Sequence, residues 1–208
     1  MILAAAGAVA VAATVGVVLF AFGGSSSVPE TIRDAGCTLQ NVPAMMKNGQ
    51  PWQEHVGEGS PIKKYPKRFK YSTFPPTSGP HLPIPAAWAV YDQPVNQQIL
   101  VHNLEHGGLV IQYGNEVPRS DLDALLDWYR KDPNAIVIAP LPALRDKIAM
   151  AAWSATSNLQ AGKVSNQRGH LATCGGFDAK AFDAFGNAYA FRGPEYHPRN
   201  VQTPNTTG

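Results

Sequence analysis

Apolar residues are spread unevenly along the chain, and the longest apolar run stands at its start. From Met1 to Gly24 no residue carries a charged side chain. A helix needs about 20 apolar residues to cross the hydrocarbon core of a membrane. Bulky residues stand at Leu19–Phe22, where a cleaved signal peptide would have small ones. We therefore predict an uncleaved single-pass anchor at residues 1–23. The rest of the chain should lie in the periplasm or outside the cell, because no Lys or Arg follows the anchor until Arg33.

The chain after the anchor begins with segments rich in glycine, serine and proline. Residues 24–36 predict a linker and a short helix that Gly36 ends. Prolines recur from residue 43 to residue 87, and proline disrupts both long helices and central strands, so this stretch should be an irregular wrap. We place one exported globular domain at residues 37–193. Residues 194–208 form a polar, extended tail that should not pack on its own.

Regular structure is predicted in the second half of the chain. The β-rich runs Leu109–Tyr113 and Ala135–Ala139 predict strands, and Lys147–Thr156 predicts a third. Leucine spacing predicts a helix from Ser120, its expected N-cap, to Lys131. A last helix should begin at Asp178. This order of elements indicates an α+β or α/β domain with a small mixed sheet, two main helices and the proline-rich wrap.

Composition and cysteine placement narrow the class of protein. Charged residues make up only 15% of the 208 residues and the net charge is +2, so we expect no nucleic-acid partner. Cys37 lies soon after the anchor and Cys174 lies late in the chain. Oxidising compartments permit disulfides, so this pair predicts a Cys37–Cys174 bridge in an exported domain. Two buried free thiols are the alternative.

Three histidines stand close together in the sequence and could bind a metal. His81, His102 and His106 are accompanied by Glu105, and three imidazoles suit zinc or copper. His102 and His106 can share an ion only if a helical turn joins them, because an extended strand would separate them too far. Gly107 is a suitable stop for that turn. The alternative is that these histidines donate hydrogen bonds to loop carbonyls and brace the backbone.

The other histidines are expected on the surface or in loops. They are His55, His170 and His197, and His55 is the best candidate among them for a fourth ligand. The run His102–His106 also fits the H-x-x-E-H pattern of inverted zinc proteases. In such an enzyme Glu105 would be the general base, and a distant acid such as Glu195 would complete the zinc shell. Two glycines follow the motif at once, whereas those enzymes place it within a long helix.

Three motifs carry a resemblance to a known family. They are PPTSGPH at Pro75–His81, WAVYDQP at Trp88–Pro94 and VHNLEHGG at Val101–Gly108. In these motifs the chain resembles the bacterial domain of unknown function 3105, whose members look like a short anchor followed by an exported domain. The resemblance extends to both cysteines and to Gly193–Glu195. The chain departs from the family at Ala89, where glycine is typical, and at Gln97–Gln98, where an acid is common.

Three hypotheses about function follow. The first is an accessory subunit without catalysis of its own, anchored in the bilayer and docked on a multi-subunit membrane complex, such as a respiratory or photosynthetic one. The second is a domain that binds or delivers copper or zinc through His81, His102 and His106. The third is a metal-dependent hydrolase, the one case in which Glu105 would be catalytic.

Overall fold

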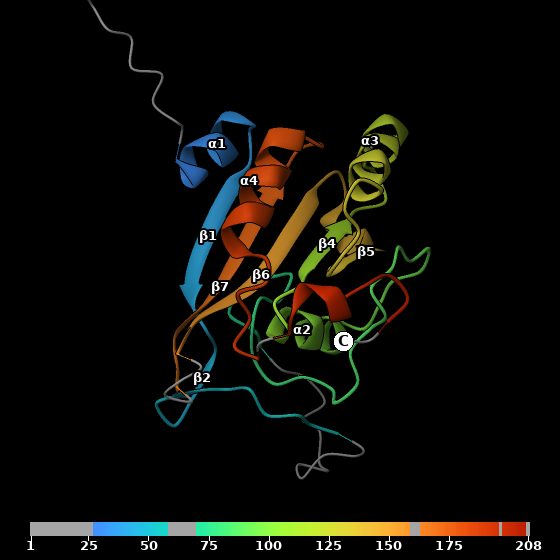
Figure 1. The fold of residues 1–208 in the computed structure, drawn as a ribbon. Helices are drawn as coiled ribbons and strands as arrows, with labels where there is room; N and C mark the ends of the chain where they lie inside the picture. Colours follow the sequence, from blue (N-terminus) through green and yellow to red (C-terminus); the bar gives the residue numbers. More distant parts are fainter. Residues whose placement is uncertain (1–26, 58–69, 159–162, 196, 207–208) are drawn as a thin grey trace, which may run out of the picture.

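The computed structural model describes residues 27–57, 70–158, 163–195 and 197–206 (Figure 1). The anchor predicted at residues 1–23 lies outside these ranges. Within them, no helix combines the length and the apolar character that a membrane crossing requires.

A five-stranded mixed sheet forms the centre of the fold, with strand order β1-β7-β6-β4-β5. Its neighbours pair antiparallel except β4 and β5, which run parallel and are joined through α3. A separate small hairpin pairs β2 with β3 inside the wrap. The strands are β1 (Thr38–Pro43), β2 (Met46–Lys47), β3 (Gln50–Pro51), β4 (Leu109–Tyr113), β5 (Ile136–Pro140), β6 (Ile148–Asn158) and β7 (Lys163–Cys174).

Helices cover both faces of this sheet. The helices are α1 (Val28–Asp34), α2 (Gln97–Glu105), α3 (Arg119–Tyr129) and α4 (Ala179–Tyr189), with short 3₁₀ turns at Pro142–Leu144 and Arg199–Val201. Figure 1 shows α1, α3 and α4 together, and α2 apart from them beside the green part of the wrap and the red C-terminal segment. The sheet therefore separates two apolar layers, one under α1, α3 and α4 and the other under α2.

The sequence of the central strands explains why both faces are covered. Along β4, Leu109 and Ile111 point into the layer of α1, α3 and α4, while Val110 points into the layer of α2. Ile136, Val137 and Ile138 alternate in the same way along β5. Successive strand side chains point to opposite faces, so a continuous apolar run requires a cover on each side.

The predicted α+β class, the mixed sheet and the three predicted strands are confirmed, with bounds that differ by one or two residues. The N-cap prediction at Ser120 is wrong, because α3 begins at Arg119 after Pro118. Pro118 is the N-cap, and its φ of −57° and ψ of 142° are extended, as is usual at that position. Two long elements, β1 and β7, were not predicted.

The predicted disulfide is confirmed, and the alternative of two free thiols is not. Cys37 directly precedes β1 and Cys174 ends β7, and the adjoining Thr38 and Thr173 face each other across these strands. The bridge thus closes the end of the antiparallel pair.

The described part of the predicted tail packs on the domain rather than standing apart. The Ala135 N–H donates to the Gln202 carbonyl and the Trp88 N–H donates to the Thr206 carbonyl. Gln202 is fully buried. The domain supplies backbone partners that the polar tail could not supply for itself.

Replacing both cysteines by alanine is expected to lower the free energy of unfolding by roughly 3–5 kcal/mol, because the bridge joins residues 137 positions apart and restricts the unfolded chain. All four tryptophans lie in the domain, so fluorescence of the full chain in detergent during a urea titration measures this quantity. Wild type treated with a reductant is the control and should unfold like the variant. Equal urea midpoints for the variant and the oxidised wild type would contradict the expectation.

Candidate metal centre

The helix α2 supplies His102 and Glu105 to the candidate site, and its C-cap residue supplies His106. The Asn96 side chain caps this helix by accepting the Gln98 N–H at 2.9 Å, and every residue from Leu100 to Glu105 is buried. His102 and His106 lie one turn apart, with their Nε2 atoms separated by 3.1 Å. The helical turn that the metal hypothesis requires is therefore present. Gly107 follows it with φ +84°, a conformation that favours glycine.

The wrap supplies two further histidines. The Val56 N–H donates to the His81 carbonyl at 2.8 Å, and the His81 N–H donates to the Glu54 carbonyl at 3.3 Å. These bonds form a short parallel bridge between His55 and His81, although the two residues lie far apart in the sequence. The irregular wrap is thus fixed at the point where it carries imidazoles.

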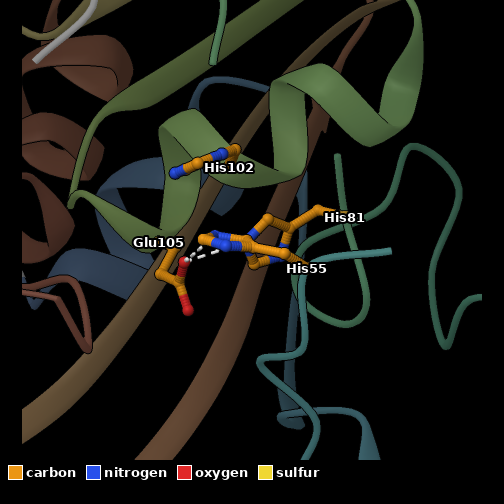
Figure 2. Close-up of side chains that lie close together, drawn as sticks. All are labelled: His55, His81, His102 and Glu105. Atoms are coloured by element: carbon orange, nitrogen blue, oxygen red, sulfur yellow. Dashed lines mark ion pairs between the residues drawn. The ribbon is translucent and has the colours of Figure 1, made fainter. Parts of the chain in front are cut away.

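Four of these five side chains, all except His106, lie close together around the Glu105 carboxylate. Glu105 Oε2 lies 2.8 Å from His81 Nε2 and 3.8 Å from His55 Nε2. Figure 2 shows Glu105 and His102 reaching from α2 and His55 and His81 from the wrap, with the ion pairs of Glu105 dashed. One ligand atom from each residue can be chosen so that all lie within 4.8 Å of one another. We call His55, His81, His102 and Glu105 the inner set.

Hydrogen bonds fix which ring nitrogen each buried histidine offers. His81 Nδ1 lies 2.8 Å from the Gly79 carbonyl, and His102 Nδ1 lies 2.7 Å from the Leu82 carbonyl. A carbonyl oxygen can only accept, so both Nδ1 atoms carry the hydrogen and Nε2 of a neutral ring carries the lone pair. His81 Nε2 is buried and makes no hydrogen bond in the described part of the chain, where it is ion-paired with Glu105 Oε2. This tautomer, held by a backbone carbonyl, is usual for metal-ligating histidines.

A chain of side-chain amides orients the Glu105 carboxylate. Trp153 Nε1–H donates to Gln167, the Gln167 amide donates to Gln53, and the Gln53 amide donates to Glu105 Oε1 at 3.2 Å. The second oxygen, Oε2, is thereby turned toward the imidazoles. Ligating carboxylates are commonly held by such outer hydrogen bonds.

A second group of donors lies on the other side of His102. His106 Nε2 lies 3.2 Å from Glu195 Oε2, and His102, His106 and Glu195 have ligand atoms within 4.8 Å of one another. We call these three residues the outer set. His197 stacks on the His106 ring with centroids 3.9 Å apart.

Close backbone contact brings the C-terminal segment to this place. The Glu195 N–H donates to the Glu105 carbonyl at 3.1 Å. A Cβ on Gly193 would lie 2.2 Å from that same carbonyl oxygen and 2.3 Å from the Gly107 nitrogen. Only a glycine leaves room for this approach, and it positions Glu195 beside His106.

Burial lowers the pKa of three imidazoles in and beside this centre. Desolvation lowers the pKa of His102 to about 4, nearby His81 adds to the effect, and the hydrogen bond to the Leu82 carbonyl opposes it. Desolvation also lowers the pKa of His55 and of His197. The hydrogen bond with His106 lowers the pKa of the Glu195 carboxyl to about 2. At neutral pH His102 is therefore unprotonated and Glu195 is ionised, the forms that metals bind.

The structure divides the predicted metal triad. His81 belongs to the inner set, His106 belongs to the outer set, and His102 belongs to both. His55, the outside candidate for a fourth ligand, joins the inner set. Glu105 was considered only as a general base, although its place one turn from His102 could have indicated a ligand. Glu195, suggested as the acid that would complete the zinc shell of an inverted protease, lies beside His106.

One expectation about the remaining histidines is wrong. His170 is buried in the middle of β7 rather than lying on the surface. Its Nδ1 lies 2.6 Å from Asn41 Oδ1, its Nε2 lies 2.6 Å from Ser154 Oγ, and Tyr189 stacks on the ring. Both ring nitrogens are therefore occupied, in contrast to His81 Nε2.

Comparison with known proteins returns a family and no activity. A family model described as "Protein of unknown function (DUF3105)" matches residues 63–201. This range holds His81, α2 and Glu195, and begins after His55. No curated protein and no solved structure matches the chain.

The metal-free chain is expected to lose stability as the pH falls from about 6.5 to about 4. The folded-state pKa values of His102 and His170 are lowered from 6.5 to about 4. Over this range the unfolded chain takes up protons that the folded chain does not. The loss should be on the order of 2–3 kcal/mol for each histidine, complete near the folded-state pKa. The lowered pKa of Glu195 acts only below about 4.5.

Urea titrations at several pH values, in the presence of a chelator, measure this loss. His170→Gln is the matched variant, because it retains only one of the two strongly shifted groups and should show a shallower pH dependence. Stability that is level from pH 7 to pH 4.5 would contradict the burial of neutral imidazoles.

Proposed function

Because the chain belongs to the DUF3105 family, whose description names no activity, we propose its function from the geometry of the centre: an extracytoplasmic domain that binds one zinc or copper(II) ion. The observation that carries the proposal is the inner set itself. Three imidazoles and one carboxylate converge there in a largely buried place, and His81 Nε2, 2.8 Å from Glu105 Oε2, makes no hydrogen bond within the described residues.

The donor set favours these metals over others. Imidazole nitrogens suit zinc and copper(II), whereas magnesium and calcium prefer oxygen donors alone. One carboxylate beside three neutral imidazoles leaves a divalent ion with a net charge of about +1, which lowers the cost of holding it in a buried place. The Cys37–Cys174 bridge fits an oxidising compartment outside the cytoplasm.

The same donors argue against the hydrolase hypothesis. Catalytic zinc sites have three protein ligands and leave a fourth position for water, whereas the inner set offers four protein donors. Glu105 is itself one of these four donors, and Gln53 holds its other oxygen, Oε1. A closed centre of this kind supports binding and holding of the ion.

A second proposal, the anchored accessory subunit, draws on the apolar surface of the wrap. Phe74 is 59% exposed and Ile84 is 70% exposed, and large apolar side chains that face water often mark protein contacts. On this proposal the chain should co-purify from native membranes with a multi-subunit complex. His102→Ala should not weaken that association. If the chain solubilised from native membranes sedimented without any partner, the accessory-subunit proposal would be contradicted.

The metal proposal predicts about one zinc or copper ion per chain when the full chain is purified in detergent without chelators. His102→Ala should reduce this to almost none, because the variant removes a donor from the middle of the centre. Elemental analysis by mass spectrometry checks both values.

His170→Gln is the control, because it changes a buried histidine outside both sets and should keep the metal. Equal metal content in wild type and His102→Ala, or none in wild type, would refute the proposal. Glu105→Gln should weaken metal binding. If Glu105→Gln instead kept its metal fully and lost a hydrolytic activity, the result would favour the hydrolase hypothesis.

A further inference from the structure

The two donor sets share one nitrogen. His102 Nδ1 donates to the Leu82 carbonyl, so only Nε2 can bind a metal in either set. That nitrogen lies 3.1 Å from His106 Nε2, and the His102 ring lies 4.8 Å from the His81 ring between centroids. One lone pair binds one ion, so the inner and outer sets are alternative positions for a single ion.

The two sets also differ in their access to solvent. The Glu195 side chain is 52% exposed, whereas that of Glu105 is 5% exposed. Glu195 Oε2 lies 3.2 Å from His106 Nε2, and an exposed carboxylate attracts cations. His55, which is 39% exposed, also reaches solvent, but it offers an imidazole nitrogen and no carboxylate charge. Charge therefore favours arrival of a cation at Glu195.

We propose that the outer set is a transfer position through which a divalent zinc or copper ion enters and leaves the inner set. This inference rests on the proposed metal-binding function. The hydrated ion first binds Glu195 and His106, and His102 Nε2 replaces one of its waters. His81, His55 and Glu105 then displace the remaining waters and the two outer donors, while His102 stays bound. No electrons are transferred, and an imidazole that binds the ion as a neutral ring releases no proton.

Retention of His102 throughout is the advantage of this arrangement. The ion is never without a protein ligand, and the hydrogen bond from Nδ1 to the Leu82 carbonyl does not need to break. Among the described residues His106 Nδ1 is buried without a hydrogen-bond partner, so no bond of theirs to this atom resists a shift of the ring as it exchanges its ligand. A stepwise exchange of this kind replaces full dehydration of the ion with a series of smaller substitutions.

Glu195→Gln is expected to slow both loading and release of the ion by about tenfold or more, because the amide removes the charged donor of the transfer position. Both rates should fall by a similar factor, so that the affinity, their ratio, changes little. Cobalt(II) absorbance in stopped flow measures loading of the metal-free full chain in detergent, and transfer to a chelator measures release. The final cobalt spectrum should match that of wild type.

Glu116→Gln is the matched control, because it removes the same charge from a glutamate that is 48% exposed and pairs with Arg145. It should load like wild type. His106→Gln should slow loading too, and its combination with Glu195→Gln should add little, since both act on one step.

Each other outcome has a definite meaning. Wild-type rates in Glu195→Gln with normal metal content would overturn the transfer position and leave the proposed function intact. If Glu195→Gln lowered the affinity only by speeding release, Glu195 would be a permanent ligand of the ion, and the inference would be overturned. Two ions bound at once would also overturn it. Failure of wild type to bind any metal would refute the proposed function itself.

Discussion

The buried carboxylate of Glu105 is the constraint on which the candidate site depends. An ionised carboxylate in a protein interior is costly unless charges or hydrogen bonds compensate for it. Here one oxygen accepts from Gln53, and the other faces His81 and His55. The wrap must therefore fold over α2 with both histidines in place. The described parts of the proline-rich wrap are joined by the bridge between His55 and His81, at the point where they complete this polar cluster.

The parts of the fold that local sequence determines were predictable, and those that depend on distant pairing were not. Apolar runs marked β4 and β5, and Asp178 caps α4 with its own side chain, as predicted. In contrast, β7 contains polar residues and Gly169, which give no alternating pattern. It is a strand because β6 and β1 pair on its two sides. Such context overrides β-propensity, so a single sequence cannot reveal it.

The candidate site, too, was predictable where local sequence determines it and not where it depends on contacts between distant segments. The spacing of His102 and His106 indicated a shared helical face, and this local part was correct. Membership of His55 depended on a bridge to His81 across the wrap, and Glu195 depended on a close contact between two glycines. Neither contact leaves a periodic signal. Composition likewise could not separate buried His170 from surface histidines, because its partners come from β1 and β6.

Electrostatics supports a single ion that moves over a pair of ions held together. Two divalent ions about 4 Å apart would repel each other by on the order of 16 kcal/mol at an effective dielectric constant of about 20. The two sets contain only two carboxylates, and they share His102 Nε2 rather than a bridging anion. If the proposed ion binds, the four donors of the inner set, one of them a buried carboxylate, would make that set its resting position. The outer set has fewer donors and more solvent, so it would suit brief occupancy as the ion enters and leaves.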